Sequence, residues 1–169
     1  MADQTAERAA LTEVLELQRQ GLVDKLSGLT EADARRAATA STLTLLSLVK
    51  HSAAWERRWF QVLLAGRRFP GEWPDTPDAH QDATFDLATS DTIDSVVAEY
   101  RAEIALAQQV IDTVDLDASC SDPQVATMTA RGVILHMIEE TARHAGHADI
   151  IRESIDGSRG RWPQELEGG

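Results

Sequence analysis

Cysteine is nearly absent from this sequence, because Cys120 is the only one among 169 residues. A single thiol excludes a disulfide within the chain and a zinc cluster built from cysteines. One unpaired thiol is also typical of a reducing compartment, so we expect a cytoplasmic protein. Cys120 lies in an expected loop, which makes it a poor candidate for a catalytic nucleophile.

Long apolar runs and basic residues are also scarce. No stretch approaches the roughly 18 apolar residues of a membrane span. The first ten residues carry Asp3, Glu7 and Arg8, so we expect neither a signal peptide nor a membrane partner. The 28 acidic residues outnumber the 16 basic ones and give a net charge of −12. Because duplex binding needs a basic face, nucleic acid is not expected as a partner.

Strand patterns are missing, whereas apolar residues at three- and four-residue steps predict four long helices. Thr5 is the expected cap of the first helix and Asp91 or Thr92 that of the third. Ser41 or Thr42 opens the second helix, and the fourth begins at about Thr129. The connection 67–90 is long enough to be functional or lid-like. Without repeats, the pattern predicts one all-α domain, a four-helix bundle over residues 1–157, followed by a loose tail over 158–169. The expected helices span residues 5–27, 41–65, 91–113 and 129–155.

Polar residues are densest in the last expected helix. An α-helix turns by about 100° per residue, so His136, Glu140, His144 and His147 share one narrow stripe, while Glu139 points elsewhere. Three imidazoles and a carboxylate are costly to bury unless something binds them, and a divalent metal is the commonest binder. The alternative is an exposed polar face on which Glu140 and His144 form an ordinary pair four residues apart.

One ion would use only part of this stripe. Glu140 and His144 lie about 6 Å apart along the helix axis and can reach the same ion, whereas His136 and His144 lie about 12 Å apart. Another helix must supply a third ligand. His51 lies in a segment that looks buried, where it needs a partner and would otherwise be a hydrogen-bonded core histidine; His80 falls in a polar loop. Three protein ligands leave open positions, as in catalytic metal sites.

Two segments carry a family resemblance. Residues 45–60, LLSLVKHSAAWERRWF, and residues 136–150, HMIEETARHAGHADI, resemble the DinB-like superfamily, and within it the mycothiol-transferase-like branch. The resemblance covers residues 5–155 and implies an up-down-down-up four-helix bundle that binds a divalent metal, often zinc or nickel. The implied ligands are His51, Glu140 and His144. Many members have histidine at the position of Glu140, but the related mycothiol-dependent maleylpyruvate isomerases have glutamate.

The resemblance also implies an activity. Members of known activity join low-molecular-weight thiols (mycothiol, bacillithiol or glutathione) to electrophiles, or use the thiol as a cofactor. We therefore expect a metal-dependent thiol S-transferase or isomerase that acts on small electrophiles. A thiol is mostly protonated at neutral pH, and a metal with an open position lowers its pKa. A stress-induced binding protein without catalysis and a metal-dependent hydrolase are the alternatives.

Three further residues near the implied ligands have expected roles. His147 would position the thiol or a water molecule at the metal. Arg143 and Arg152 would contact an anionic part of the thiol or the substrate, although solvated surface arginines are the alternative for both. Relatives occur as monomers and as dimers, so a homodimer is one of the two expected states.

Overall fold

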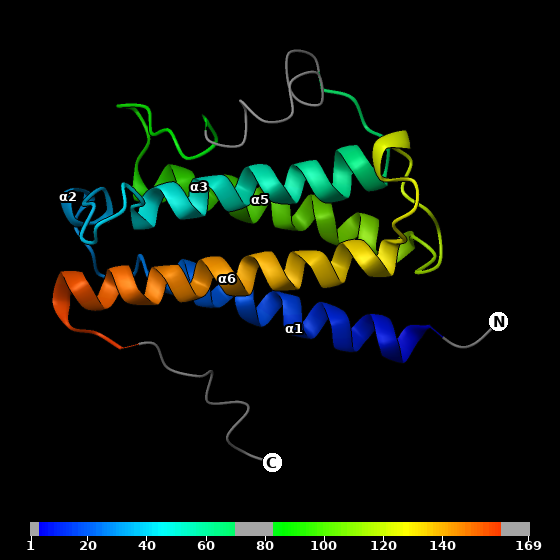
Figure 1. Cartoon of the computed structure of the whole chain (residues 1–169), viewed down its shortest axis with the longest axis horizontal. Coiled ribbons are helices and arrows are strands. Elements are labelled where there is room, and N and C mark those ends of the chain that lie inside the picture. The colour runs from blue at the N-terminus through cyan, green and yellow to red at the C-terminus, as the bar shows by residue number, and fades with distance from the viewer. Residues whose placement is uncertain (1–3, 70–82, 160–169) are drawn as a thin grey trace.

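The chain is helical in the part that the computed structural model describes, residues 4–69 and 83–159. Those residues form no strand, and their one isolated β-bridge joins Ser119 to Thr129. The prediction of an all-α protein is confirmed (Figure 1). The elements in chain order are α1 (Thr5–Asp24), α2 (Glu31–Ala34), α3 (Leu45–Glu56), the π-helix η1 (Arg57–Leu64), α5 (Ile93–Thr113), the 3₁₀ turn η2 (Pro123–Val125) and α6 (Ala130–Asp156).

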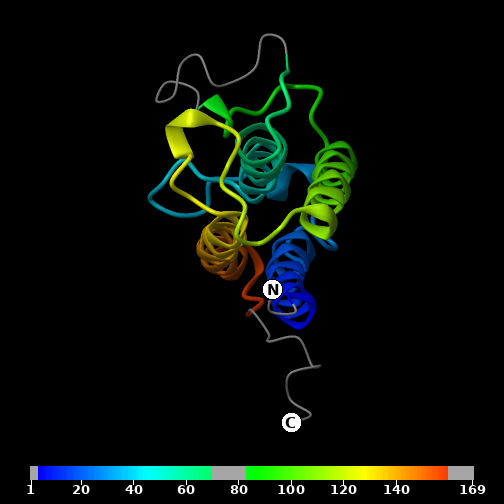
Figure 2. The ribbon, with the colours of Figure 1, turned by 90° about the vertical axis from the view of Figure 1, so that its right-hand side faces the viewer.

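The long helices form an up-down-down-up bundle. In Figure 1, α1 and α6 run in one direction, and α3 with η1 and α5 run in the other. Both views place α1 beside α6 and α3 beside α5 (Figure 2). Because α3 and α5 are parallel, Ile93 at the start of α5 lies at the same end of the bundle as Leu45 at the start of α3.

Side-chain caps define where three of the long helices begin. Thr44 and Thr92 each accept a hydrogen bond from a backbone N–H three residues on, and Ser47 and Ser95 reciprocate in capping boxes. Thr129 caps α6, which begins close to the predicted start at about residue 129. The residues predicted to cap the first helix and to open the second were wrong. The N-cap of α1 is Gln4, and α3 starts later than expected because the Ser41 hydroxyl accepts from Leu43 N–H in a local turn.

The second long helix differs from its prediction in one further respect. After Glu56 the regular α-helix widens into η1, and the helix ends at Leu64, followed by Gly66 with φ +69°. π-Helical turns are rare and often lie at functional sites. The apolar spacing of residues 57–64 is compatible with either kind of helix, so periodicity predicted only that this segment is helical.

The bundle buries its apolar faces in two clusters, one towards each end of the helices. The described part of the 67–90 connection contributes Phe85 and Leu87 to the first cluster, whereas residues 70–82, with His80, lie outside the described residues. Among the helices of the described ranges, none is long and apolar enough to cross a membrane. The larger core residues are Leu22, Leu46, Val49, Tyr100 and Ile151 in one cluster, and Leu15, Phe60, Ile111, Leu116 and Ile134 in the other.

Candidate metal centre

His51 of α3 and His144 of α6 meet across the bundle. Their ring centroids lie 4.8 Å apart at an interplanar angle of 76°. Two imidazoles on one tetrahedral zinc ion place their centroids about 5 Å apart, given Zn–N distances of about 2 Å. The two helices therefore bring these predicted residues together at a spacing that one ion could bridge.

The connection after residue 82 holds the His51 ring in place. His51 Nδ1 lies 2.6 Å from the Thr84 hydroxyl oxygen, and Phe85 stacks on the ring at a centroid distance of 3.9 Å. Trp55, one turn further along α3, also contacts the ring, at 4.2 Å. A hydrogen bond at Nδ1 leaves Nε2 as the nitrogen available to a ligand. Sequence reasoning missed Thr84 and Phe85, because a loop has no periodicity to indicate which way its side chains point.

Burial keeps both histidines neutral. Desolvation, followed by repulsion from the protonated form of His144 and from the charged Arg58, lowers the pKa of His51 from 6.5 to about 3. Desolvation also lowers the pKa of His144, and Glu140 opposes this shift only in part. Neutral imidazole is the form that binds a metal.

His144 provides the test of whether a metal fits this site. Both of its ring nitrogens are buried, and neither has a hydrogen-bond partner among residues 4–69 and 83–159. A buried polar atom without a partner costs about 1–3 kcal/mol. Glu140 Oε2 lies 3.7 Å from His144 Nε2, close to the roughly 3.4 Å between two ligand atoms on a tetrahedral zinc ion. Two imidazoles and a carboxylate also suit zinc and nickel chemically.

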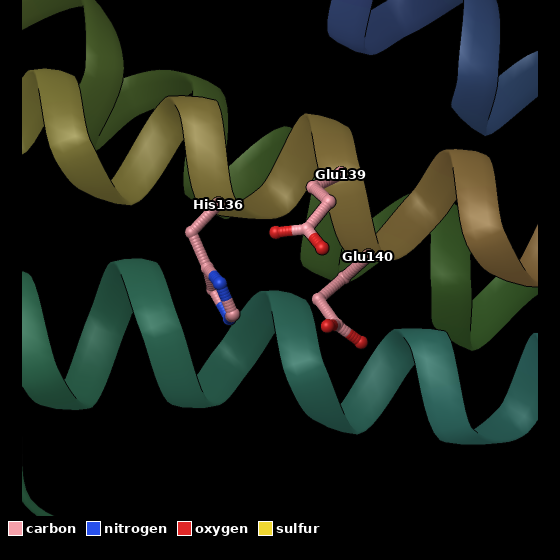
Figure 3. A group of neighbouring side chains, drawn as sticks. All are labelled: His136, Glu139 and Glu140. Carbon is pink, nitrogen blue, oxygen red and sulfur yellow. The ribbon is translucent and has the colours of Figure 1, made fainter.

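Glu140 lies close to His144 and also close to a second group of potential ligand atoms. In the described part of the chain, one set of three residues brings its ligand atoms within 4.8 Å of one another, namely His136, Glu139 and Glu140 (Figure 3). The expectation that Glu139 points away from the stripe was wrong. The helical angle gives the direction of its Cα–Cβ bond, but this exposed side chain is long enough to reach back.

The three other predicted site residues lie at different distances from this centre. His147 is exposed, and its ring centroid lies 6.1 Å from that of His144. Arg143 pairs with Glu140 at 3.2 Å and with Glu139 at 2.5 Å. Arg152 donates instead to the carbonyls of Lys25 and Ser27 and pairs with Asp156. The ligand set and the roles of His147, Arg143 and Arg152 stay predictions.

A cation and two indoles border the His51 side of the centre. The Arg58 guanidinium carbon lies 5.0 Å from the Trp55 ring centroid and 5.9 Å from that of Trp59. Trp59 in turn lies 4.2 Å from the His136 ring. Burial lowers the pKa of Arg58 to about 10, which leaves it charged at neutral pH. The junction of α3 and the π-helix thus places a positive charge and two indole rings beside the candidate ligands.

Comparisons with known proteins agree with this architecture. The model of the mycothiol S-transferase family matches residues 10–157. A crystal structure of a conserved protein from Enterococcus faecalis is similar, with a TM-score of 0.62 and 16% identity, over 89% of this chain and 97% of that chain. At that identity the likeness shows the fold alone. No match was found among the curated proteins.

Proposed function

The chain belongs to the mycothiol S-transferase family, and from that premise we propose that it is a metal-dependent enzyme that joins a low-molecular-weight thiol to small electrophiles. His51, Glu140 and His144 would hold the metal. The observation that carries this proposal is the buried His144 ring, whose two nitrogens lack partners among the described residues, beside His51 and Glu140. Mycothiol is the thiol that the family suggests.

The proposed reaction is a nucleophilic transfer of sulfur. A zinc or nickel ion would lower the pKa of a thiol that binds it and so supply the thiolate at neutral pH. The sulfur forms a bond to carbon of the electrophile, and either a leaving group departs with the bonding electron pair or, in an activated double bond, the π electron pair moves away from the attacked carbon and is protonated. His147 is exposed on the turn after His144, and we assign it to position the thiol and accept its proton.

Neighbouring residues would orient the thiol. Arg143 is half-exposed beside Glu140, where it could meet a carboxylate of the thiol or of the electrophile. Arg152 is less accessible to such a group, because its donors already serve two backbone carbonyls and Asp156. Trp55 and the stacked Phe85 cover the His51 ring and limit the access of water to it.

Metal content and thiol-dependent turnover together test the proposal. We expect about one zinc or nickel ion in the His51–Glu140–His144 site by elemental mass spectrometry, and loss of that ion in His51→Ala and His144→Ala with unchanged far-ultraviolet circular dichroism. Turnover of a fluorogenic alkyl halide should require mycothiol, bacillithiol or glutathione. Metal binding without turnover would instead indicate a binding protein, and turnover of an ester without thiol would indicate a hydrolase. A metal content that is unchanged from the wild type in both variants would contradict the site.

A further inference from the structure

A second group of ligand atoms lies one turn along α6 from the candidate metal centre. His136, Glu139 and Glu140 occupy positions i, i+3 and i+4, which face one another on a helix. We propose that these three residues bind a second divalent cation and share Glu140 with the first site. The sharing of Glu140 rests on the proposed function, whereas the grouping of the three side chains does not.

The geometry of the group is close to that of a bound ion. One ligand atom from each side chain lies within 4.8 Å of the other two. Three atoms within 4.8 Å of one another lie within about 2.8 Å of a common point, and metal–ligand bonds are about 2.1 Å long, so a displacement of up to about 0.7 Å per ligand is needed. Glu139 can supply it, because its side chain is 62% exposed. In Figure 3 the three side chains extend from the same helix, His136 and Glu140 towards the facing helix and Glu139 with one carboxylate oxygen turned to the His136 side.

His136 brings a donor atom that has no other use in the described residues. Its ring packs on Trp59 at 4.2 Å, so its orientation is fixed. Its Nε2 atom is buried and has no hydrogen-bond partner in residues 4–69 and 83–159. A cation bound at this nitrogen would replace an unsatisfied polar atom with a bond. This feature separates the group from an ordinary exposed pair of glutamates.

Charge also favours a cation here. Glu139 and Glu140 share one counterion, Arg143, with N–O distances of 2.5 Å and 3.2 Å. Two carboxylates against one guanidinium leave one uncompensated negative charge, in a chain whose net charge is already −12. The Arg143 side chain is 53% exposed, so it can turn into solvent and leave both carboxylates to a metal.

The spacing of the ligands along α6 requires two separate ions and excludes a single ion that binds all of them. His136 and His144 are separated by two turns, about 12 Å along the axis, and cannot bind one ion together. Glu140 stands midway between them. Its Oε2 atom faces His144 Nε2 at 3.7 Å, while Oε1 pairs with Arg143. A carboxylate can bridge two ions with its two oxygens.

Titration of the full-length, metal-stripped chain with Co²⁺ and with Zn²⁺, followed by calorimetry and by cobalt d–d absorption, tests the proposal. We expect two equivalents per chain, of which His136→Ala and Glu139→Gln each lose one, while His144→Ala keeps the one at His136. Arg143→Gln should tighten the second equivalent by about tenfold, because the competing ion pairs are gone. Glu153→Gln, an exposed glutamate of the same helix, is the matched control and should keep both.

The outcomes separate this proposal from the proposed function. A wild-type chain that binds no ion, or binds one that survives both His136→Ala and Glu139→Gln, would overturn the second site. One ion lost in His136→Ala but kept in His144→Ala would support this group and count against the His51–Glu140–His144 site. Circular dichroism of each variant establishes that the helices are intact, and Glu139→Gln, at an exposed position, is not expected to disturb folding.

Discussion

His51 and His144 lie edge to face with ring centroids 4.8 Å apart, one on each of two facing helices of the bundle. Both rings are buried and neutral, and His144 has no hydrogen-bond partner in the described residues. Without a ligand this arrangement leaves polar nitrogen atoms buried without hydrogen-bond partners, which costs free energy. The metal-free protein should therefore be less stable than the loaded one, and its stability should depend on pH.

The first prediction concerns that pH dependence. A histidine of the unfolded chain titrates near pH 6.5, whereas the folded pKa of His51 is about 3. The lowered folded pKa means that the contribution of His51 is complete above pH 6.5 and is lost as the pH falls towards 3. Between pH 6.5 and pH 5 the metal-free protein should lose about 1.5 kcal/mol of unfolding free energy through His51.

Urea unfolding in the presence of a chelator measures this loss. His51→Gln removes the titrating group, so its unfolding free energy should fall less steeply over the same pH interval. Most carboxylates titrate below this interval, which keeps the comparison clean. Equal slopes for the wild type and the variant would show that His51 is already protonated, or solvated, in the folded state.

The second prediction concerns Thr84, whose hydroxyl meets His51 Nδ1 at 2.6 Å. Groups that orient a metal-binding imidazole typically contribute 10- to 100-fold to metal affinity. Thr84→Val keeps the size of the side chain and removes the hydroxyl, so the zinc affinity should fall by about tenfold. Competition with a chromophoric chelator measures it. Thr89→Val, at an exposed threonine of the same connection, should leave the affinity unchanged, and similar affinities in both variants would contradict the role of Thr84.

The sequence predicted which segments are helical better than it predicted the relative directions of the helices or the change from α-helix to π-helix. Amphipathic spacing identifies which face of a helix is buried, and threonines such as Thr92 and Thr129 mark helix starts by chemistry that is local. The parallel course of α3 and α5 is not local, so only the family resemblance implied it. The widening of the helix after Glu56 was missed because i→i+5 bonding leaves no distinct apolar pattern over so short a segment.

The candidate site shows the same division. His51, Glu140 and His144 were proposed from position and resemblance, and the bundle brings the two histidines together. Thr84 and Phe85 come from an irregular connection, where no period indicates orientation. The reach of Glu139 was missed because the helical angle describes a Cα–Cβ direction and says nothing about where a flexible carboxylate ends.

The third prediction compares two glycines whose replacement by alanine should change the stability of the protein in opposite directions. Gly157 ends α6 with φ +78°, a left-handed conformation that costs other residues about 1–2 kcal/mol. Gly21 lies within α1, where glycine costs about 1 kcal/mol relative to alanine. An added Cβ meets nothing within 4 Å at either position, so backbone conformation alone decides. Gly157→Ala should destabilise and Gly21→Ala should stabilise, as urea unfolding can measure, and a shared sign would contradict this account.

The last prediction concerns the ion pair between Arg19 of α1 and Glu56 of α3. Arg19 donates to both Glu56 oxygens, at 2.8 Å and 2.6 Å, and both side chains are 0% exposed. Breaking a buried pair leaves a charge without a partner and costs about 3–5 kcal/mol, whereas replacing both members by apolar residues is often neutral. Arg19→Met should therefore be strongly destabilising, and Arg19→Met with Glu56→Leu should recover most of the loss.

Acid should partly rescue the single variant, which separates a charge effect from a packing effect. Burial already raises the pKa of Glu56 with Arg19 beside it, and removing the guanidinium raises it further. A carboxyl group whose pKa is raised in the folded state stabilises that state more as the pH falls. The loss of unfolding free energy in Arg19→Met should therefore shrink as the pH falls towards 5. The exposed pair of Arg159 and Glu153 supplies the control, since Arg159→Ala should change stability by less than about 0.5 kcal/mol. A deficit of Arg19→Met that does not vary with pH would mean that lost packing, and not an unpaired Glu56 charge, causes it.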